Sequence, residues 1–281
     1  MDNNHFAIVM AGGIGARFWP SSTPDYPKQF IDMIGNGSSL LQNTFSRLEK
    51  IVPKENIYIV TQLRYQKIIL NQLGGKLNED QIISEPDRRN TAPCILLASL
   101  KIQKRNPDAK IIVSPSDHSI QNEVIFKSDM EFALASAGKE NLITFGIVPT
   151  FPATGFGYVS VKEDENRLKT VLEFTEKPDE NKAKSLIDSG NYYWNSGIFV
   201  WSVNAVVNGF KEYVPKLFDL FNAGLSKLNT PDEKKFISEK YPLAENISID
   251  YALLEKSNLI HLIPASFDWD DLGSWKSIYD L

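Results

Sequence analysis

Residues 8–30 read I-V-M-A-G-G-I-G-A-R-F-W-P-S-S-T-P-D-Y-P-K-Q-F, and no other stretch of the chain indicates its fold as strongly. The apolar residues 6–10 fit a buried strand that passes directly into Gly12, Gly13 and Gly15. Glycine adopts positive φ angles and allows close approach to the backbone, so a loop of this composition exposes its N–H groups. The pattern predicts a strand that ends in an anion-binding loop at the edge of a sheet.

Two cationic side chains, Arg17 and Lys28, follow the glycine loop. Together with exposed N–H groups, a guanidinium and an ammonium predict that the loop binds a polyphosphate. The spacing differs from a P-loop, which requires Gly-Lys-Ser/Thr, and from a dinucleotide loop, whose third glycine is replaced here by Phe18. The glycines alone would also fit a tight turn without a ligand. The prediction therefore depends on the order G-G-x-G-x-R followed by P-K-Q-F.

The composition is ordinary for a globular protein. The chain has 281 residues, 42% hydrophobic and 23% charged, which suits one large domain or two small ones. Its net charge of −5 argues against a nucleic-acid partner, so phosphate binding depends on local cations. The single cysteine, Cys94, excludes an internal disulfide, and its apolar neighbours predict core packing. The first residues are polar and no apolar run approaches about 18 residues, so we expect no membrane partner and a cytoplasmic location.

Helical and extended patterns alternate through the first half of the chain. The extended patterns are residues 6–10, 57–61, 82–85, 111–114 and 142–148, and the helical ones are 40–51, 65–73, 91–105 and 124–137. We expect Ser39 and Gln42 to form a capping box and Thr91 to cap the third helix. Strands separated by helices of this length predict βαβ units and a mostly parallel sheet that is covered on both faces.

The second half changes character but shows no linker. Residues 157–162 and 170–175 alternate with a period of two and predict an antiparallel pair. The segments 179–189 and 247–256 are helical patterns, and 197–201 and 259–264 are extended ones. Because no repeat or low-complexity segment separates the halves, we expect residues 1–281 to form a single domain.

Two acidic segments are candidates for a metal site. Asp117, in S-P-S-D-H, follows the predicted strand 111–114 and would lie at the carboxyl end of the sheet, where open α/β sheets bind ligands. Asp271 belongs to F-D-W-D-D-L-G-S-W, in which a bound cation would relieve repulsion between three aspartates. Mg²⁺ typically takes one or two carboxylates plus phosphate oxygens. The alternatives are a turn at Asp117 with His118 in a capping hydrogen bond, and aspartates at an exposed helix start.

Several other polar residues fit recognition of a phosphorylated sugar. Both Glu176 and Lys177 lie in F-T-E-K-P: Glu176 could accept hydrogen bonds from sugar hydroxyls, and Lys177 could contact a phosphate. Asn195, in W-N-S-G, could bridge hydroxyl groups, and Asp250 adds a carboxylate in S-I-D-Y. Each also has an ordinary interpretation: solvated surface for the first pair, a turn for Asn195 and helix capping near Asp250.

Taken together, these segments resemble the family of nucleotidyltransferases that make nucleotide sugars, in particular its GDP-mannose-forming members. The resemblance extends from Met10 to Trp275. It rests on G-G-I-G-A-R-F-W-P-S-S, P-K-Q-F, E-P-D-R-R-N-T-A-P, S-P-S-D-H, F-T-E-K-P, N-S-G-I-F-V-W, S-I-D-Y-A-L-L-E-K and D-D-L-G-S-W. It implies a Rossmann-like mixed α/β sheet, mostly parallel and flanked by helices, with an antiparallel sugar-binding extension. Residues 1–150 would be the nucleotide-binding half and residues 151–281 the sugar-phosphate half.

The resemblance also implies roles for individual residues. Arg17, Lys28 and Asp117 would act in catalysis, and Asp117 and Asp271 would bind Mg²⁺. The nucleotide would contact Ala11, Gly12, Gly13, Gly15, Arg17, Glu85, Asn90 and Thr91. The sugar phosphate would contact Gly157, Glu176, Lys177, Asn195 and Asp250.

The reaction implied is transfer of GMP from GTP to mannose 1-phosphate, giving GDP-mannose and pyrophosphate. Glu85 stands where thymidine-specific relatives carry a base-reading glutamine, and a carboxylate can accept from both N1–H and the 2-amino group of guanine. The alternatives are another nucleotide or hexose, and a non-catalytic sensor that binds nucleotide sugars. Relatives usually continue into a β-helix or another carboxyl-terminal domain, which we do not expect in this sequence. A homodimer is compatible with the resemblance.

Overall fold

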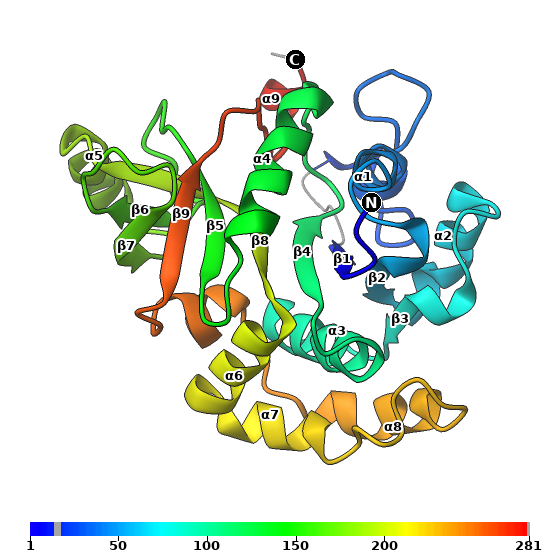
Figure 1. The fold of residues 1–281 in the computed structure, drawn as a ribbon. Coiled ribbons are helices and arrows are strands. Elements are labelled where there is room, and N and C mark those ends of the chain that lie inside the picture. Colours follow the sequence, from blue (N-terminus) through cyan, green and yellow to red (C-terminus); the bar gives the residue numbers. More distant parts are fainter. Residues whose placement is uncertain (14–17, 280–281) are drawn as a thin grey trace.

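The computed structural model describes residues 1–13 and 18–279 (Figure 1). In this part of the chain, nine strands form one mixed sheet in the order β3-β2-β1-β4-β8-β5-β9-β7-β6. The strands are β1 (His5–Ala11), β2 (Ile57–Gln62), β3 (Ile82–Glu85), β4 (Lys110–Pro115), β5 (Leu142–Ile147), β6 (Tyr158–Val161), β7 (Lys169–Thr175), β8 (Tyr192–Ser202) and β9 (Ile260–Pro264). The pairings make β7 and β8 run opposite to the other strands. The mixed α/β fold class is therefore confirmed.

Helices cover both faces of the sheet (Figure 1). They are α1 (Leu40–Leu48), α2 (Gln66–Leu73), α3 (Thr91–Arg105), α4 (Glu123–Ser136), α5 (Glu180–Asp188), α6 (Val203–Tyr213), α7 (Pro215–Asn222), α8 (Glu233–Lys240) and α9 (Trp275–Tyr279). Side chains alternate along β1, so Phe6 and Ile8 pack into the core formed with α3 and α6, whereas Ala7 and Val9 pack into the core formed with α1 and α4. Full burial of a side chain as large as Phe6, Ile8 or Val9 contributes about 1.5–3 kcal/mol.

The predicted elements agree closely with the observed ones in the first half of the chain. Strand β3 and helix α3 have the predicted bounds, and Ser39 and Gln42 form the predicted capping box of α1. The prediction that Thr91 caps α3 is wrong. Asn90 is the cap, with a positive φ of 64°, and its side chain accepts a hydrogen bond from the N–H of Thr91.

Two elements of the second half differ from their sequence patterns. The helix predicted over 247–256 is a short π-helical turn, Asp250–Leu254. The strand predicted over 197–201 is the longer β8, which lies between β4 and β5 and runs antiparallel to both. Its pairing with β5 is irregular near Gly146, and Gly197 has a φ of +71°. This irregularity sets Asn195 at the carboxyl end of β5.

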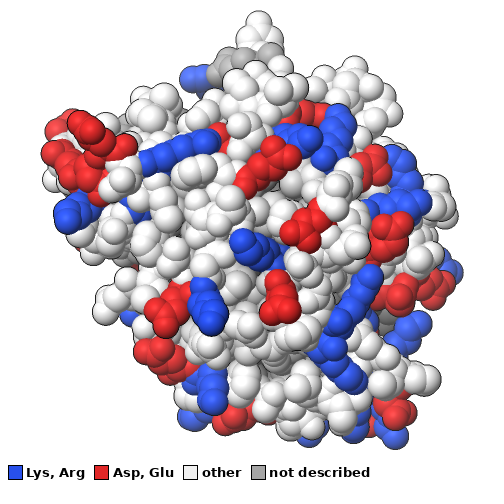
Figure 2. Space-filling model, in the orientation of Figure 1, with Lys and Arg blue, Asp and Glu red and all other residues white. Residues whose placement is uncertain are grey.

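The carboxyl ends of the parallel strands meet at one edge, as the βαβ pattern predicts. Gly12 and Gly13 follow β1 there, Ser116 and Asp117 follow β4, and Glu85 ends β3. On the face shown in Figure 2, acidic and basic side chains are interspersed. The net charge of −5 therefore does not produce a field of one sign on this face.

Candidate active site

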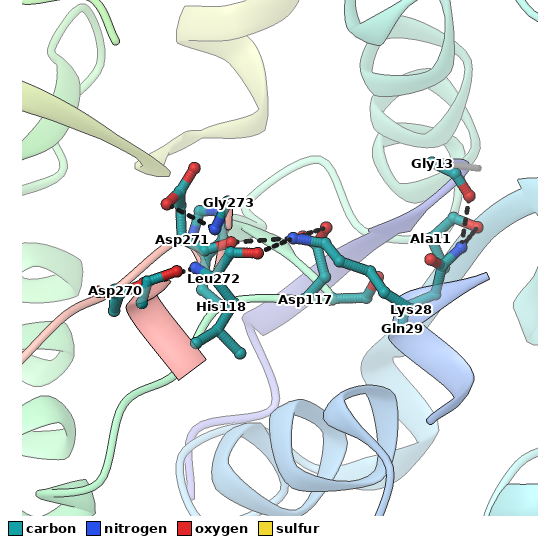
Figure 3. Close-up of polar contacts among 12 residues, drawn as sticks. Ala11, Gly13, Lys28, Gln29, Asp117, His118, Asp270, Asp271, Leu272 and Gly273 are labelled. Carbon is teal, nitrogen blue, oxygen red and sulfur yellow. Dashed lines mark hydrogen bonds and ion pairs between the residues drawn. The ribbon is translucent and has the colours of Figure 1, made fainter. Parts of the chain in front are cut away.

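The glycine loop is held by side chains that donate to its carbonyl groups. Gln29 Nε2 donates to the carbonyl oxygens of Ala11 (3.3 Å) and Gly13 (2.8 Å), as Figure 3 shows. Gln62 Nε2 donates to the oxygen of Gly12 at 2.9 Å. In a trans peptide the N–H points opposite to the C=O, so the N–H groups of Gly12 and Gly13, which share peptides with the carbonyls of Ala11 and Gly12, point away from the two glutamines. The arrangement preorganises donors for an anion.

Gln29 is a functional residue that the sequence reasoning did not single out. It is almost fully buried, and it lies next to Lys28 in a short 3₁₀ turn, Lys28–Phe30. Its signal was present in the P-K-Q-F motif. The predicted phosphate contacts of Gly15 and Arg17 lie outside the described residues.

Lys28 joins the two acidic segments (Figure 3). Its Nζ lies 3.1 Å from Asp117 Oδ2 and donates to the backbone oxygens of Asp271 (2.9 Å) and Leu272 (3.1 Å). The segments are also tied by Ser119 and Asp270, whose backbone groups exchange hydrogen bonds of 2.8 and 3.1 Å. The fold thus brings together two acidic segments that are far apart in the sequence.

The two carboxylates have different electrostatic surroundings. Burial opposes ionisation of Asp117, but the ammonium of Lys28 outweighs it and holds the pKa below its usual value. Burial raises the pKa of Asp271; Lys28 opposes this rise and the charge of Asp270 adds to it. The Asp271 carboxylate accepts from the N–H of Gly273 at 3.0 Å. Both aspartates therefore contact the Lys28 ammonium, Asp117 through its carboxylate and Asp271 through its backbone carbonyl.

The oxygen atoms around Lys28 fit a hard cation. Carboxylate and carbonyl oxygens are the ligands that Mg²⁺ prefers, and the ammonium already lies among three of them. Among residues 1–13 and 18–279, no group of three or more His, Cys, Asp or Glu is placed to hold a metal. A Mg²⁺ ion needs only one or two carboxylates when phosphate oxygens and water complete its shell.

His118 is a second residue whose role the sequence left open. Trp269 Nε1 donates to its Nδ1 at 3.1 Å, and the two rings meet edge to face at 5.3 Å. Burial lowers the pKa of His118 to about 4, although Asp117 opposes the shift. The imidazole is therefore neutral at physiological pH. It packs as a wall of the pocket rather than as a capping group.

A pocket of about 240 Å³ lies beside these acidic segments. Its lining includes the predicted site residues Thr91, Gly157, Glu176, Asn195, Asp250 and Asp271, together with His118 and Trp269. Residues from both halves of the sequence therefore face one cavity.

Hydrogen bonds orient the polar groups of this pocket. Asn195 Nδ2 donates to Asp250 Oδ1 at 3.1 Å, while Thr144 Oγ1 donates to Asn195 Oδ1 at 2.7 Å. Thr144 is fully buried and was not predicted; it fixes which end of the Asn195 amide faces Asp250. Burial, with the charge of Glu176, raises the pKa of Asp250 to about 6.

Glu176 and Gly157 lie against one another. A Cβ atom on Gly157 would stand 2.6 Å from Glu176 Oε2, so a side chain there would displace the carboxylate from its present position. Lys177 Nζ lies 2.7 Å from Glu176 Oε1. Glu176 thus lines the pocket, whereas the Lys177 side chain is 58% exposed and contacts the site through Glu176.

Several non-glycine residues with positive φ angles border the site. Among the described non-glycine residues with positive φ, Asn90 (64°), Lys177 (44°) and Leu272 (47°) border the candidate site, and Asn229 (57°) lies elsewhere. Such conformations cost about 1–3 kcal/mol each and persist where surrounding structure holds them. Their clustering supports a functional role for this edge.

Glu85 lies beside the glycine loop at the end of β3. It is 6% exposed, and its Oε1 accepts a hydrogen bond from the hydroxyl of Tyr241. A Cβ on Gly12 would stand 3.4 Å from Glu85 Oε2. Burial raises the pKa of Glu85 to about 7, although the hydrogen bond from Tyr241 acts in the opposite direction.

This fold and site have clear relatives. Residues 6–281 match the family model described as Nucleotidyl transferase, and the chain belongs to that family. Its sequence is 37% identical over 280 residues to mannose-1-phosphate guanylyltransferase RfbM of Salmonella typhimurium, covering 98% of this chain and 58% of the relative. It is 36% identical to a mannose-1-phosphate guanylyltransferase of Escherichia coli K12, covering 59% of that protein. The chain thus spans less than two thirds of these relatives.

A solved structure gives the same result for the fold. The structure from Thermus thermophilus described as a mannose-1-phosphate geranyltransferase superimposes with a TM-score of 0.88 at 26% identity. The match covers 99% of this chain and 80% of the other. The sheet described above therefore matches that of this solved structure over nearly the whole chain.

Proposed function

We propose that the protein transfers GMP from GTP to mannose 1-phosphate, forming GDP-mannose and pyrophosphate, in the presence of Mg²⁺. The proposal rests mainly on one arrangement of residues. The start of the glycine loop, held by Gln29, lies near the Lys28–Asp117 ion pair, and both lie beside a pocket whose polar lining comes largely from the second half of the sequence. Relatives with 37% and 36% identity that are named for this activity support it.

The nucleotide would lie across the carboxyl ends of β1 and β3. Its phosphates would meet the amides of Gly12 and Gly13 and the side chains of Arg17 and Lys28. The base would lie toward Glu85. Ala11 would contribute backbone, and Asn90 and Thr91 would contact the nucleotide from the start of α3, where Thr91 already lines the pocket.

The sugar phosphate would occupy the 240 Å³ pocket. Asn195, held by Thr144, and Asp250 would contact hydroxyl groups, with Glu176 as a further acceptor. Lys177 would neutralise part of the phosphate charge. Gly157 would leave space for the sugar phosphate in the pocket, because a side chain at this position would contact Glu176.

The chemistry requires positioning more than proton transfer. The second pKa of a phosphate monoester is about 6, so the attacking oxygen is already anionic near neutral pH. The main obstacles are repulsion between two polyanions and the charge that develops on the leaving pyrophosphate. Arg17, Lys28 and the loop amides would offset both. Bound at Asp117 and Asp271, Mg²⁺ would supply charge screening at the α-phosphate.

The test is pyrophosphate release from a panel of GTP, dTTP, UTP and ATP with several hexose 1-phosphates, with and without Mg²⁺. We expect turnover with GTP and mannose 1-phosphate, and loss of turnover on chelation. Preference for another pair would support a related transferase instead. Binding without any turnover would support a non-catalytic sensor.

Gln29→Leu tests the clamp on the glycine loop. We expect about a 10-fold loss of GTP affinity, because two hydrogen bonds that fix the loop are removed. Isothermal titration with GTP measures it. Gln81→Leu is a matched control, since Gln81 is similarly buried and also donates to two carbonyls (Lys54 and Ile57), but beside the amino end of β2. Equal affinities in both variants would contradict the clamp.

Glu85→Gln tests base selection. An amide offers one acceptor and one donor, so it should tolerate thymine better and guanine worse than a carboxylate. We expect the GTP-over-dTTP ratio of kcat/KM to fall about 10–100-fold. Glu233→Gln is the control, because Glu233 is also a partly buried carboxylate but pairs with Lys101 in the α8 region. An unchanged ratio would remove Glu85 from base selection.

The cellular setting is also a proposal. None of the helices in residues 1–13 and 18–279 combines the length and the apolar character needed to cross a bilayer. We place the enzyme in the cytoplasm, without a nucleic-acid or membrane partner, and propose a homodimer. Size-exclusion chromatography with light scattering measures its subunit number.

A further inference from the structure

A buried carboxylate–phenol pair lies next to the glycine loop. Glu85 comes from β3, and Tyr241 comes from the short turn Tyr241–Leu243 after α8. Tyr241 is fully buried, and its hydroxyl donates to Glu85 Oε1. Its ring stacks on Phe221 at 5.6 Å with an interplanar angle of 24°.

The phenol leaves the second carboxylate oxygen facing the loop. Glu85 Oε2 stands 3.4 Å from the position that a Gly12 Cβ would take. Because Oε1 is already held, the carboxylate cannot rotate freely about its last bond without losing this hydrogen bond. Oε2 is therefore fixed toward the place where a nucleotide base would lie.

The segment that carries Tyr241 is tied to the start of α3. The N–H of Ile249 donates to Thr91 Oγ1 at 2.8 Å, and the N–H of Ala92 donates to the oxygen of Ile247 at 3.1 Å. Arg89 also donates to the backbone oxygen of Pro242. These hydrogen bonds, together with the stacking on Phe221, hold the Tyr241 segment on the side of the sheet where the glycine loop lies.

We propose that Tyr241 is a positioning residue for base recognition: its hydroxyl orients the Glu85 carboxylate so that it accepts from N1–H and the 2-amino group of guanine. The inference rests on the proposed use of GTP and extends it to a residue outside the sequence motifs. Tyr241 touches neither the reacting phosphates nor the base, so it acts through Glu85.

The charge state of Glu85 gives the proposal a measurable signature. Burial raises the pKa of Glu85 to about 7, while Tyr241 and Arg88 act to lower it. The other titratable groups that face the pair are Arg89 and the buried thiol of Cys94. Burial also raises the pKa of Tyr241 well above its usual value, so the phenol remains a donor.

Ionisation of Glu85 makes the recognition of guanine depend on pH. Only ionised Glu85 accepts from two donors, so guanine recognition strengthens as pH rises through about 7. Removing the phenol removes an interaction that favours the ionised form. The midpoint in Tyr241→Phe must therefore move to higher pH.

The experiment compares dissociation constants of GTP and ITP from about pH 6 to about pH 8.5. ITP lacks the 2-amino group but carries the same triphosphate, so the ratio of the two cancels titration of the phosphates. The proteins are the wild type, Tyr241→Phe, Glu85→Gln and the double variant. Tyr58→Phe is the control. Tyr58 is also a buried tyrosine, but its hydroxyl accepts a hydrogen bond from Arg105 near the amino end of β2, at the other end of the strands from the glycine loop.

We expect Tyr241→Phe to reduce the GTP-over-ITP preference near neutral pH by about 10-fold and to shift its midpoint upward. Tyr58→Phe should match the wild type. In the Glu85→Gln background the phenylalanine should have no further effect on the preference, which isolates the pair in a double-mutant cycle.

Two results would overturn the inference. One is a Tyr241→Phe protein that weakens GTP and ITP equally with an unchanged midpoint, which a merely structural tyrosine would produce. The other is a GTP-over-ITP preference of the wild type that does not change with pH near neutrality. This second result can be obtained even if Tyr241→Phe does not fold. Failure of the proposed function is distinct, since the wild type would then not use GTP at all.

Discussion

Asp117→Asn is expected to lower kcat about 10²–10³-fold, the scale for losing one preorganised charge contact at a reacting phosphate. Asparagine keeps the shape of the side chain but removes the charge that Lys28 contacts at 3.1 Å. It also removes one of the two carboxylates proposed for Mg²⁺. Steady-state turnover with saturating GTP and mannose 1-phosphate measures the effect, and circular dichroism checks the fold.

The control for Asp117→Asn is Asp129→Asn. Asp129 is almost fully buried, pairs with Arg167 and accepts from the N–H of Ser266 at 2.7 Å. We expect Asp129→Asn to lower thermal stability with little change in kcat. Near wild-type turnover in Asp117→Asn would defeat the assignment of Asp117 to catalysis.

Lys28→Met is expected to have the second largest effect, a fall of about 10²-fold in kcat. The ammonium would otherwise neutralise charge on the triphosphate, and its loss leaves Asp117 without its cationic neighbour, which raises the pKa of Asp117. The side chain is only 12% exposed, so solvent does not replace it well. Single-turnover measurements separate this loss from an effect on product release.

The same variant should bind metal differently in the absence of nucleotide. In the structure the ammonium contacts oxygen atoms of Asp117, Asp271 and Leu272. If a divalent ion uses these oxygens, removing the ammonium should tighten binding of Mn²⁺ alone, which electron paramagnetic resonance measures. Lys28→Arg keeps the charge and should bind Mn²⁺ as the wild type does. Equal Mn²⁺ affinity in Lys28→Met would show that ammonium and metal use separate atoms.

The sequence predicted most of the fold because each local signal agreed with the tertiary arrangement. The apolar run at β1 with its glycine loop, and the capping box of α1, are decided within a few residues. The π-helical turn Asp250–Leu254 was predicted as an ordinary helix, since its periodicity is similar. Thr91 has a side chain suited to capping, but its hydroxyl is used by Ile249 and Asn90 takes the cap.

The site could be predicted only as far as the motifs reach. Asp117 was predicted at the carboxyl edge because it follows a strand, whereas Asp271, Asn195 and Asp250 were predicted from local motifs that give no position in the sheet. In the structure Asn195 lies within β8, and irregular pairing with β5 brings it to the pocket. Tyr241 and Thr144 gave no signal, because they act through contacts between segments 156 and 51 residues apart. Such contacts depend on strand order, and in particular on β8 entering between β4 and β5.

That strand order also limits how the two halves of this chain can be separated. Strand β8 comes from the second half of the sequence, yet it supplies hydrogen-bond partners to β4 and β5 of the first. Deleting the second half would leave the edges of β4 and β5 that β8 covers without partners, and unpaired strand edges invite aggregation. A second half taken from a relative must therefore bring a strand that fits both β4 and β5.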